Sequence, residues 1–369
     1  MIVDEGLPGA GSGALVRPHV EAAWIWVLRD LAPDLLSAER AAAGSMTAAE
    51  FESVAADILA RIKHQLSEAA SDPNAARRLR LMLGSDEAVD ALPRLMTALR
   101  HRALLPKAQT FGRSINGIAE EAGLTAALQS MPLQDPVLAG LLFQSAIGQV
   151  QNPTRLVLAA IRISGGAGET FLLRAGFGPL IDGLLAHAQN QLHLLQPLGT
   201  FADIDLTCRG LDRYHRLIRA VAGYVELPRG GRWAGTLSYT TRQVSERVEP
   251  RLRSLVTDIN LAMRRGREGS DRLDDNAILA AIGGVYLLAT VRECRDSLAL
   301  NAVFDQAWTQ SGQALEMHIE RYLDLLRRNP GDRVVGARLD AAIKMAEVRF
   351  NPEYAETLRR ARAAAERRG

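Results

Sequence analysis

A glycine-rich stretch at residues 164–170, Ser-Gly-Gly-Ala-Gly-Glu-Thr, is the part of this sequence that most resembles a chemical site. An apolar run leads into it and a helical pattern leads out, which is the order of a loop that binds phosphate through backbone N–H groups. A P-loop also needs a lysine directly after its last glycine, to reach the β- and γ-phosphates. Here Glu169 follows Gly168, so an anion would face the phosphate. The stretch is therefore predicted to be a turn that ends one helix and begins the next, and not a nucleotide site.

The histidines and cysteines do not follow a metal-binding pattern. The chain has seven His and two Cys, with no HExxH motif and no zinc-finger spacing. Asp212 and His215 come nearest to the Glu-x-x-His motif of a di-iron helical bundle, but the motif occurs once and carries Asp in place of Glu. Asp274 and Asp275 precede an apolar helix, so one of them is predicted to cap that helix rather than hold magnesium. The sequence predicts no metal and no cofactor.

Two short arginine clusters, at 264–272 and 359–368, raise the question of nucleic-acid binding. Both clusters contain acidic residues, and neither has interleaved aromatic side chains on which bases could stack. The chain carries 44 basic and 42 acidic residues, so its net charge of +2 creates no field that selects nucleic acid or an anionic membrane. We expect both clusters to be solvated helix ends, and no nucleic acid as a partner.

The predicted loop at 226–239 is the best candidate for a docking segment. It is long for a connection between helices, and such loops are disproportionately functional. Arg229, Arg232 and Trp233 lie in it beside several glycines. Trp and Arg are the residue types enriched at binding hot spots, so these three residues form the predicted partner-binding site. The alternative is that Trp233 packs into the protein and fixes the loop, while both arginines stay solvated.

Helical periodicity runs through most of the chain and must position any such site. Caps or first-turn prolines mark helix starts at Thr47, Ser85, Asp135-Pro136 and Asn152-Pro153. Long amphipathic patterns cover about 240–265 and 301–328. There is no series of alternating segments that would predict strands, and aromatic residues make up only 5%. The expected fold is all-α: a multi-helix bundle or an irregular helical-repeat array of about a dozen helices.

Composition divides the chain into four parts. Residues 1–14 are Gly-rich and expected to be flexible, and residues 15–130 form an N-terminal helical region. Residues 131–200 are more apolar, so their helices are expected to be buried on more than one side, and residues 201–369 form a C-terminal helical bundle. The longest apolar run, 277–291, is expected to be too short to span a bilayer and to form a buried helix, without stable membrane insertion.

Cysteine usage and the N-terminus predict a cytoplasmic protein. Cys208 and Cys294 do not form a disulfide framework and fit a reducing compartment. The N-terminal residues lack the basic segment and apolar core of a signal peptide. Three of the 44 basic residues are lysines and the other 41 are arginines, a bias typical of a GC-rich bacterial genome.

Because no catalytic pattern is visible, the sequence favours an interaction protein: an adaptor, scaffold or assembly subunit that binds another protein or a second copy of itself. The alternative is an enzyme or small-molecule-binding protein with a pocket in the apolar central helices, at 134–200. The two hypotheses differ in the surface they need. An exposed apolar groove favours the interaction protein, whereas a deep cavity with convergent polar groups favours the ligand pocket.

Overall fold

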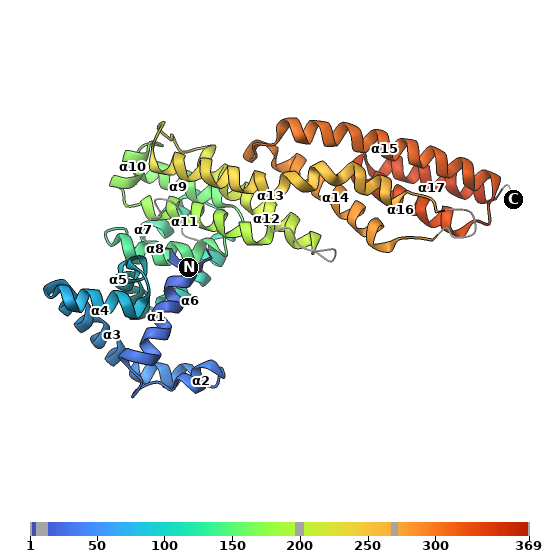
Figure 1. Ribbon diagram of the computed structural model, residues 1–369. Helices are drawn as coiled ribbons and strands as arrows, with labels where there is room; N and C mark the ends of the chain where they lie inside the picture. Colours follow the sequence, from blue (N-terminus) through green and yellow to red (C-terminus); the bar gives the residue numbers. More distant parts are fainter. Residues whose placement is uncertain (1, 5–13, 196–202, 267–271, 368–369) are drawn as a thin grey trace. The chain divides into compact units, whose positions relative to one another are not determined.

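The structure is a computed structural model of the 369-residue chain, and it describes residues 2–4, 14–195, 203–266 and 272–367. Seventeen α-helices cover most of these residues, with almost no strand (Figure 1). This confirms the all-α fold that the helical periodicity predicts. The helices outnumber the expected dozen because pieces of one or two turns, such as α2 and α10, are too short to leave a periodic pattern.

The chain divides into two compact units, and each is described by itself. Unit 1 contains Met1–Asn190 and Arg216–Leu237, and unit 2 contains Gln191–His215 and Ser238–Gly369. Helices α12 (Ile204–Ala222) and α13 (Arg232–Ala262) contribute residues to both units. The four-part division expected from composition stays a prediction.

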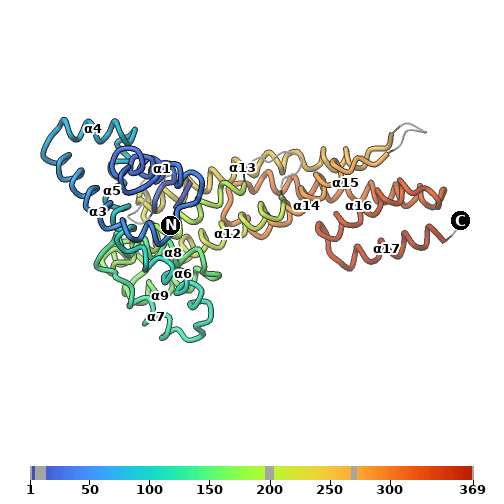
Figure 2. The backbone as a smooth tube through the Cα atoms, turned by 90° about the horizontal axis from the view of Figure 1, so that it is seen from below, coloured from blue at the N-terminus to red at the C-terminus, as the bar shows by residue number. Residues whose placement is uncertain are grey.

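Unit 1 begins with a small parallel strand pair and a group of amphipathic helices. Of the expected flexible segment 1–14, residues 1 and 5–13 lie outside the described residues, and β1 (Ile2–Val3) pairs with β2 (Leu15–Val16). The helical elements that follow are α1 (Arg17–Trp26), its π-helical continuation η1 (Val27–Leu31), α2 (Ala38–Ala42), α3 (Ala48–Ser71), α4 (Pro73–Leu83) and α5 (Asp86–Arg100). Helices α3 and α4 lie side by side, and α5 packs against both α1 and α3 (Figure 2).

Local sequence determines where these helices begin. Thr47 Oγ1 accepts a hydrogen bond from the Glu50 N–H at 3.2 Å, and the Glu50 carboxylate accepts one from the Thr47 N–H at 2.7 Å, which is the predicted capping box. These bonds, led by that from the Thr47 N–H and helped by Arg40, lower the pKa of Glu50 to about 2. Ser85 Oγ accepts from the Ala88 N–H at 3.1 Å and starts α5, as its residue type predicts.

Six helices form the central part of unit 1 in the described residues. They are α6 (Leu104–Ile115), α7 (Glu121–Gln129), α8 (Pro136–Ile147), α9 (Pro153–Ser164), α10 (Glu169–Arg174) and α11 (Gly178–Gln189). Helix α8 packs against both α6 and α11, and all of its residues from Ala139 to Ile147 are buried. Gly112 lets α6 approach closely, because a Cβ atom there would collide with the carbonyl of Ala146. The burial expected for this apolar region is therefore observed in α8.

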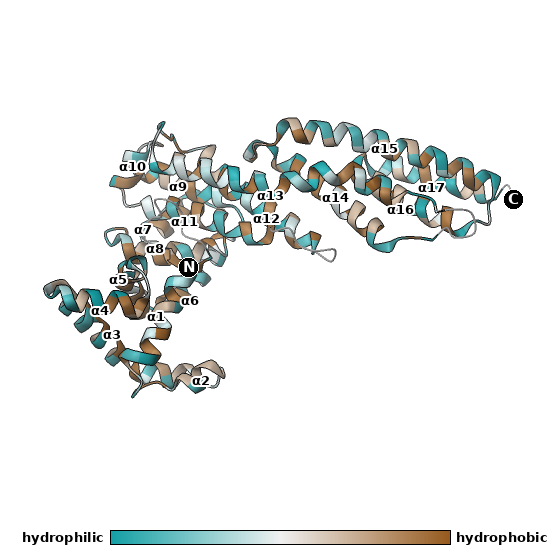
Figure 3. Cartoon of the chain, in the orientation of Figure 1, coloured by the Kyte–Doolittle hydropathy of each residue, from teal (hydrophilic) through white to brown (hydrophobic). Residues whose placement is uncertain are grey.

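Unit 2 consists of long amphipathic helices. After the 3-10 turn η2 (Asn190–Leu195) and parts of α12 and α13 come α14 (Asp275–Cys294), the 3-10 turn η3 (Arg295–Ser297), α15 (Asn301–Arg328), α16 (Arg333–Arg349) and α17 (Pro352–Glu366). Helix α16 packs against α14, α15 and α17. Polar and apolar residues alternate along α13 and α15 (Figure 3). Asp274 Oδ1 accepts from the Ala277 N–H at 3.0 Å, which confirms the predicted cap of α14.

Helix α14 carries the longest apolar run of the chain. Among the described residues, the segment Asp275–Ser297 is the one that is long and apolar enough to cross a membrane, by length and composition alone. This corrects the expectation that the run is too short, because the helix continues past 277–291 at both ends. A core helix passes the same test, and α14 packs against α15 and α16. The absence of stable membrane insertion stays a prediction.

Candidate interaction cleft

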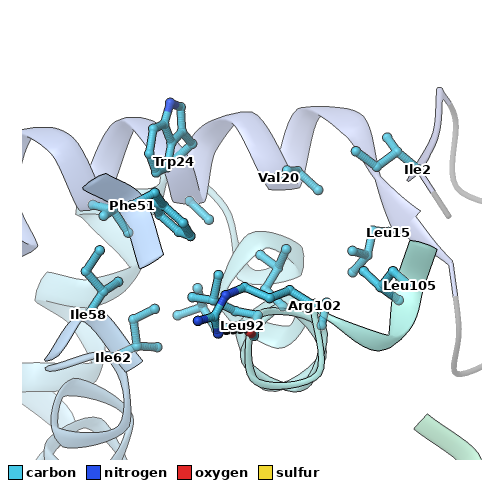
Figure 4. A pocket seen from close by; sticks show the side chains of 15 residues that line it. Ile2, Leu15, Val20, Trp24, Phe51, Ile58, Ile62, Leu92, Arg102 and Leu105 are labelled. Atoms are coloured by element: carbon cyan, nitrogen blue, oxygen red, sulfur yellow. Dashed lines mark hydrogen bonds between the residues drawn. The ribbon is translucent and has the colours of Figure 1, made fainter. Parts of the chain in front are cut away.

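An apolar cleft opens among the N-terminal helices of unit 1 (Figure 4). Its walls come from α1, α3 and α5, and its volume is about 340 Å³. Among the described residues, all of the lining side chains except one are apolar. They are Ile2, Leu15, Val20, Ala23, Trp24, Val27, Phe51, Ile58, Ile62, Leu92, Leu95, Ala98, Leu99, Arg102 and Leu105.

The wall formed by α1 and its continuation is one face of a helix. Val20, Ala23, Trp24 and Val27 stand at positions i, i+3, i+4 and i+7, which fall on the same side of a helix. Because a helix rises about 1.5 Å per residue, this row is about 10 Å long, or two turns. The Trp24 ring meets the Phe51 ring of α3 edge-on, with 6.1 Å between the ring centroids. The cleft is therefore a trough that follows α1.

Arg102, in the turn after α5, is the one charged residue in the described part of the lining. Its Nε donates to the Glu52 carboxylate at 2.6 Å, and an Nη donates to the Leu99 carbonyl at 2.8 Å. The hydrogen bond between the two side chains lowers the pKa of Glu52 and raises that of Arg102. The guanidinium is already neutralised, so the described lining residues offer no uncompensated charge that would hold a charged ligand.

The sequence predicts these lining residues as parts of apolar helix stripes, and not as a site. Phe51, Ile58 and Ile62 belong to the stripe of α3, and Leu92, Leu95 and Leu99 to that of α5. A stripe predicts which side of a helix avoids water. It does not predict whether three stripes close completely on one another. The sequence does contain one sign that α1 is apolar on more than a single narrow stripe: Trp24 and Trp26 are two residues apart and so lie on different sides of the helix.

Trp233, one of the three predicted partner-binding residues, lies in the interior of unit 1. Its side chain is 1% exposed, and its Nε1 donates to Asp182 Oδ1 of α11 at 2.8 Å. Arg232 forms an ion pair with the same carboxylate at 2.9 Å. Arg229 is exposed in the connection that precedes α13. A partner at this surface would meet the two arginines and not the Trp233 ring, and the docking role of the three residues stays a prediction.

The expected loop at 226–239 is shorter in the structure. Helix α13 begins at Arg232 rather than near Thr240, and the connection covers residues 223–231. The buried contact between Trp233 and Asp182 explains the difference, because it fixes the first turn of α13 against α11. Burial raises the pKa of Asp182, opposed by the hydrogen bond from Trp233 and the charge of Arg232.

The glycine-rich stretch 164–170 meets this same connection. The Glu226 N–H donates to the Ala167 carbonyl at 3.0 Å, and Gly168 forms an isolated parallel bridge with Glu226. Gly165 has a φ of +74°, a left-handed conformation that favours glycine, and it ends α9. Helix α10 then begins at Glu169. The stretch is a joint between two helices, as the sequence predicts.

A second hollow lies beside the central helices and is more polar. It has a volume of about 480 Å³. Arg174, Asp182 and Arg232 line it together with Leu133, Gln134, Pro136, Leu173, Gly176, Gly178 and Pro179. This hollow falls in the region where the sequence places the alternative ligand pocket. Asp182 and Arg232 already pair with each other across it.

No group of three or more His, Cys, Asp or Glu side chains is placed to hold a metal ion in the part of the chain that the structure describes. His215 contacts the Ser297 hydroxyl, with 2.9 Å between Nδ1 and Oγ. In the two arginine clusters, 267–271 and Arg368 lie outside the described residues. Arg359 and Arg362 form ion pairs with acidic residues of α16.

No protein family, no curated protein and no solved structure matches this chain. Its function is therefore inferred from the geometry and chemistry of its surfaces.

Proposed function

We propose that this protein is a non-catalytic interaction module, acting as an adaptor, scaffold or assembly subunit. Its partner is another protein, whose amphipathic helix places apolar side chains in the cleft between α1, α3 and α5. The observation that carries the proposal is the lining of that cleft, which is apolar at every described position except Arg102. Exposed apolar clefts of this kind are typical of protein-binding surfaces.

The lining favours a helix over an extended peptide. An extended segment exposes backbone N–H and C=O groups, and burying these groups without partners costs free energy. The cleft offers such groups only apolar side chains and an arginine that is already bonded. A helix pairs its own backbone groups. The two-turn row on α1 also matches the i, i+3, i+4, i+7 spacing of apolar residues on a partner helix.

The same lining disfavours a fatty acid or another ligand with a charged head. A buried carboxylate needs a cation or several donors to offset the loss of water. Arg102 is the one cation that the described residues place in the lining, and Glu52 and the Leu99 carbonyl accept hydrogen bonds from it. The carboxylate of Glu52 would also repel an anionic head.

Selection of helical peptides against the full-length protein tests the proposal. We expect the selected peptides to carry apolar residues at i, i+3, i+4 and i+7. Val20→Lys places a charge in the trough and should weaken their binding by at least about tenfold, because burying an unpaired charge is costly. Ile25→Lys is the matched control, since Ile25 is on the same helix, is 55% exposed and does not line the cleft. Equal affinity of wild type and Val20→Lys would contradict the proposal.

A small-molecule-binding function is the second candidate, and the polar hollow beside α8 and α11 favours it. Two arginines and a carboxylate converge there, as in sites that orient a polar ligand. Native mass spectrometry of the protein purified from its own source separates the two functions. A bound small molecule that is lost in Arg174→Gln would support the second candidate and weaken the first.

A cytoplasmic location is part of the same proposal. Neither Cys208 nor Cys294 forms a disulfide, as expected in a reducing compartment. Cell fractionation tests this directly, and recovery of the protein outside the cytoplasm would contradict it.

A further inference from the structure

Arg349, the last residue of α16, is buried in unit 2, and no carboxylate of the described residues contacts it. The residue is 7% exposed, and its guanidinium carbon lies 3.5 Å from the ring centroid of Trp308 and 5.0 Å from that of Phe350. Its Nε donates to Ser311 Oγ at 3.3 Å, and one Nη donates to the Trp308 carbonyl. The other Nη has no hydrogen-bond partner among the described residues.

A second arginine approaches the same ring. Arg292 of α14 is exposed, and its guanidinium carbon lies 4.9 Å from the Trp308 ring centroid. Within the part of the chain that the structure describes, Arg292 makes no ion pair. Buried arginines are normally paired with an acid. Here two guanidiniums contact one half-buried tryptophan, and no acidic side chain in the described ranges pairs with either of them.

The electrostatics of the pair are unfavourable as it stands. Burial, and then the like charge of Arg292, lower the pKa of Arg349 to about 10. The negative charge of Glu316 raises the pKa of Arg349, but Glu316 does not form an ion pair with it. An anion that accepts hydrogen bonds from Arg349 and lies near Arg292 would offset both of these causes.

We propose that Arg292 and Arg349 bind an oxyanion, a carboxylate or phosphate group of a ligand, beside Trp308. The unbonded Nη of Arg349 and the exposed guanidinium of Arg292 supply charge-assisted donors, and guanidinium groups match the geometry of both anions. The Trp308 ring holds the two planes in place through cation–π contacts. This site is separate from the apolar cleft in residues and in chemistry, so either assignment can fail without the other.

Arg295 provides a matched control on the adjoining turn. Its guanidinium carbon also lies over an aromatic ring, 5.3 Å from the centroid of Phe304. Unlike Arg292, it has an acidic neighbour, Asp305, at 3.7 Å. Arg292→Gln and Arg295→Gln therefore remove the same type of exposed, ring-stacked charge, but only the first removes an uncompensated one.

Isothermal titration calorimetry on the full-length protein, at constant ionic strength in chloride, tests the site with inorganic phosphate and with succinate. We expect saturable binding of at least one of the two. Arg292→Gln should weaken it by about tenfold or more, which corresponds to the loss of a charge-assisted hydrogen bond. Arg295→Gln should leave it unchanged. Binding of phosphate alone would identify a phosphate-bearing ligand, and binding of succinate alone a carboxylate.

Thermal unfolding of the wild type supplies a second readout that needs no variant. A ligand that binds only the folded state raises the melting temperature. We expect phosphate or succinate to raise it above the value in chloride at equal ionic strength. The proposal is overturned if neither anion gives saturable heat or a shift, or if Arg292→Gln and Arg295→Gln weaken binding equally, because the effect is then general charge screening.

Discussion

Trp24 of α1 and Trp233 of α13 belong to the same unit, but their surroundings differ. Trp233 is fully buried, and a carboxylate 51 residues earlier in the chain receives its N–H. Trp24 is half-buried in the wall of an open trough, against Phe51. One site is closed by a specific polar contact, whereas the other is apolar and left accessible. A tryptophan beside an arginine, such as Trp233, can therefore be structural, while one within an apolar stripe, such as Trp24, can face a cleft.

The largest expected effect comes from truncating the two tryptophans. Trp233→Ala should lower the free energy of unfolding by about 3–5 kcal/mol, because it removes a large buried side chain and leaves a cavity. Trp24→Ala should cost clearly less, since its ring is already partly in contact with water. Denaturant-induced unfolding of both variants measures the difference. Equal losses would show that the trough is closed in solution.

A larger side chain in the trough should reduce the stability of the protein less than a larger side chain in the core. Ala23 lines the cleft, so Ala23→Leu can extend into open space and should change stability by no more than about 1 kcal/mol. Ala55 is fully buried on α3 and does not line the cleft. Ala55→Leu should therefore destabilise the protein by about 1–3 kcal/mol through overpacking. Thermal unfolding of the pair measures the contrast, and a large loss in Ala23→Leu would argue against an open cleft.

The smallest expected effect is a dependence on pH at the closed site. Because burial raises the pKa of Asp182 above its ordinary 3.8, the folded protein holds that proton more tightly than the unfolded chain. The contribution of Asp182 to stability is therefore present below pH 3.8 and is lost as the pH rises through the raised pKa. The Asp182→Asn variant should not show this loss of stability with rising pH. Unfolding free energies of wild type and variant, compared across acidic pH, measure it.

Glu50 supplies the control of opposite sign for that experiment. Its pKa is lowered from 4.5 to about 2, so its contribution to stability is present above pH 4.5 and is lost as the pH falls toward 2. Relative to Glu50→Gln, the wild type should lose stability on acidification. The same direction of change in both comparisons would contradict the assigned causes of the two pKa shifts.

Helix positions could be read from the sequence because their signals are local. Thr47, Glu50, Ser85 and Asp274 cap the helices that their residue types predict, and α15 begins and ends where its amphipathic pattern does. Such caps depend on residues two or three positions apart. They need no knowledge of the tertiary fold.

The burial of Trp233 and the trough could not be predicted from the sequence, because each depends on residues that are far apart in the chain. The burial of Trp233 requires Asp182 from α11, and the trough requires that the stripes of α1, α3 and α5 meet without closing. Likewise, the Arg349 stack combines residues from α14, α15 and α16. The sequence identifies the side chains in each case, but not their partners.

Photo-crosslinking in the native cell tests the central claim, that the trough is a protein-binding site. A benzophenone amino acid in place of Val20 reacts with whatever occupies the trough, and the same group in place of Ile25 samples the opposite, exposed side of α1. We predict that position 20 gives a defined crosslink to an amphipathic helical segment of another protein, and that position 25 does not. A crosslink to a small apolar molecule at position 20, or the same products at both positions, would contradict the account.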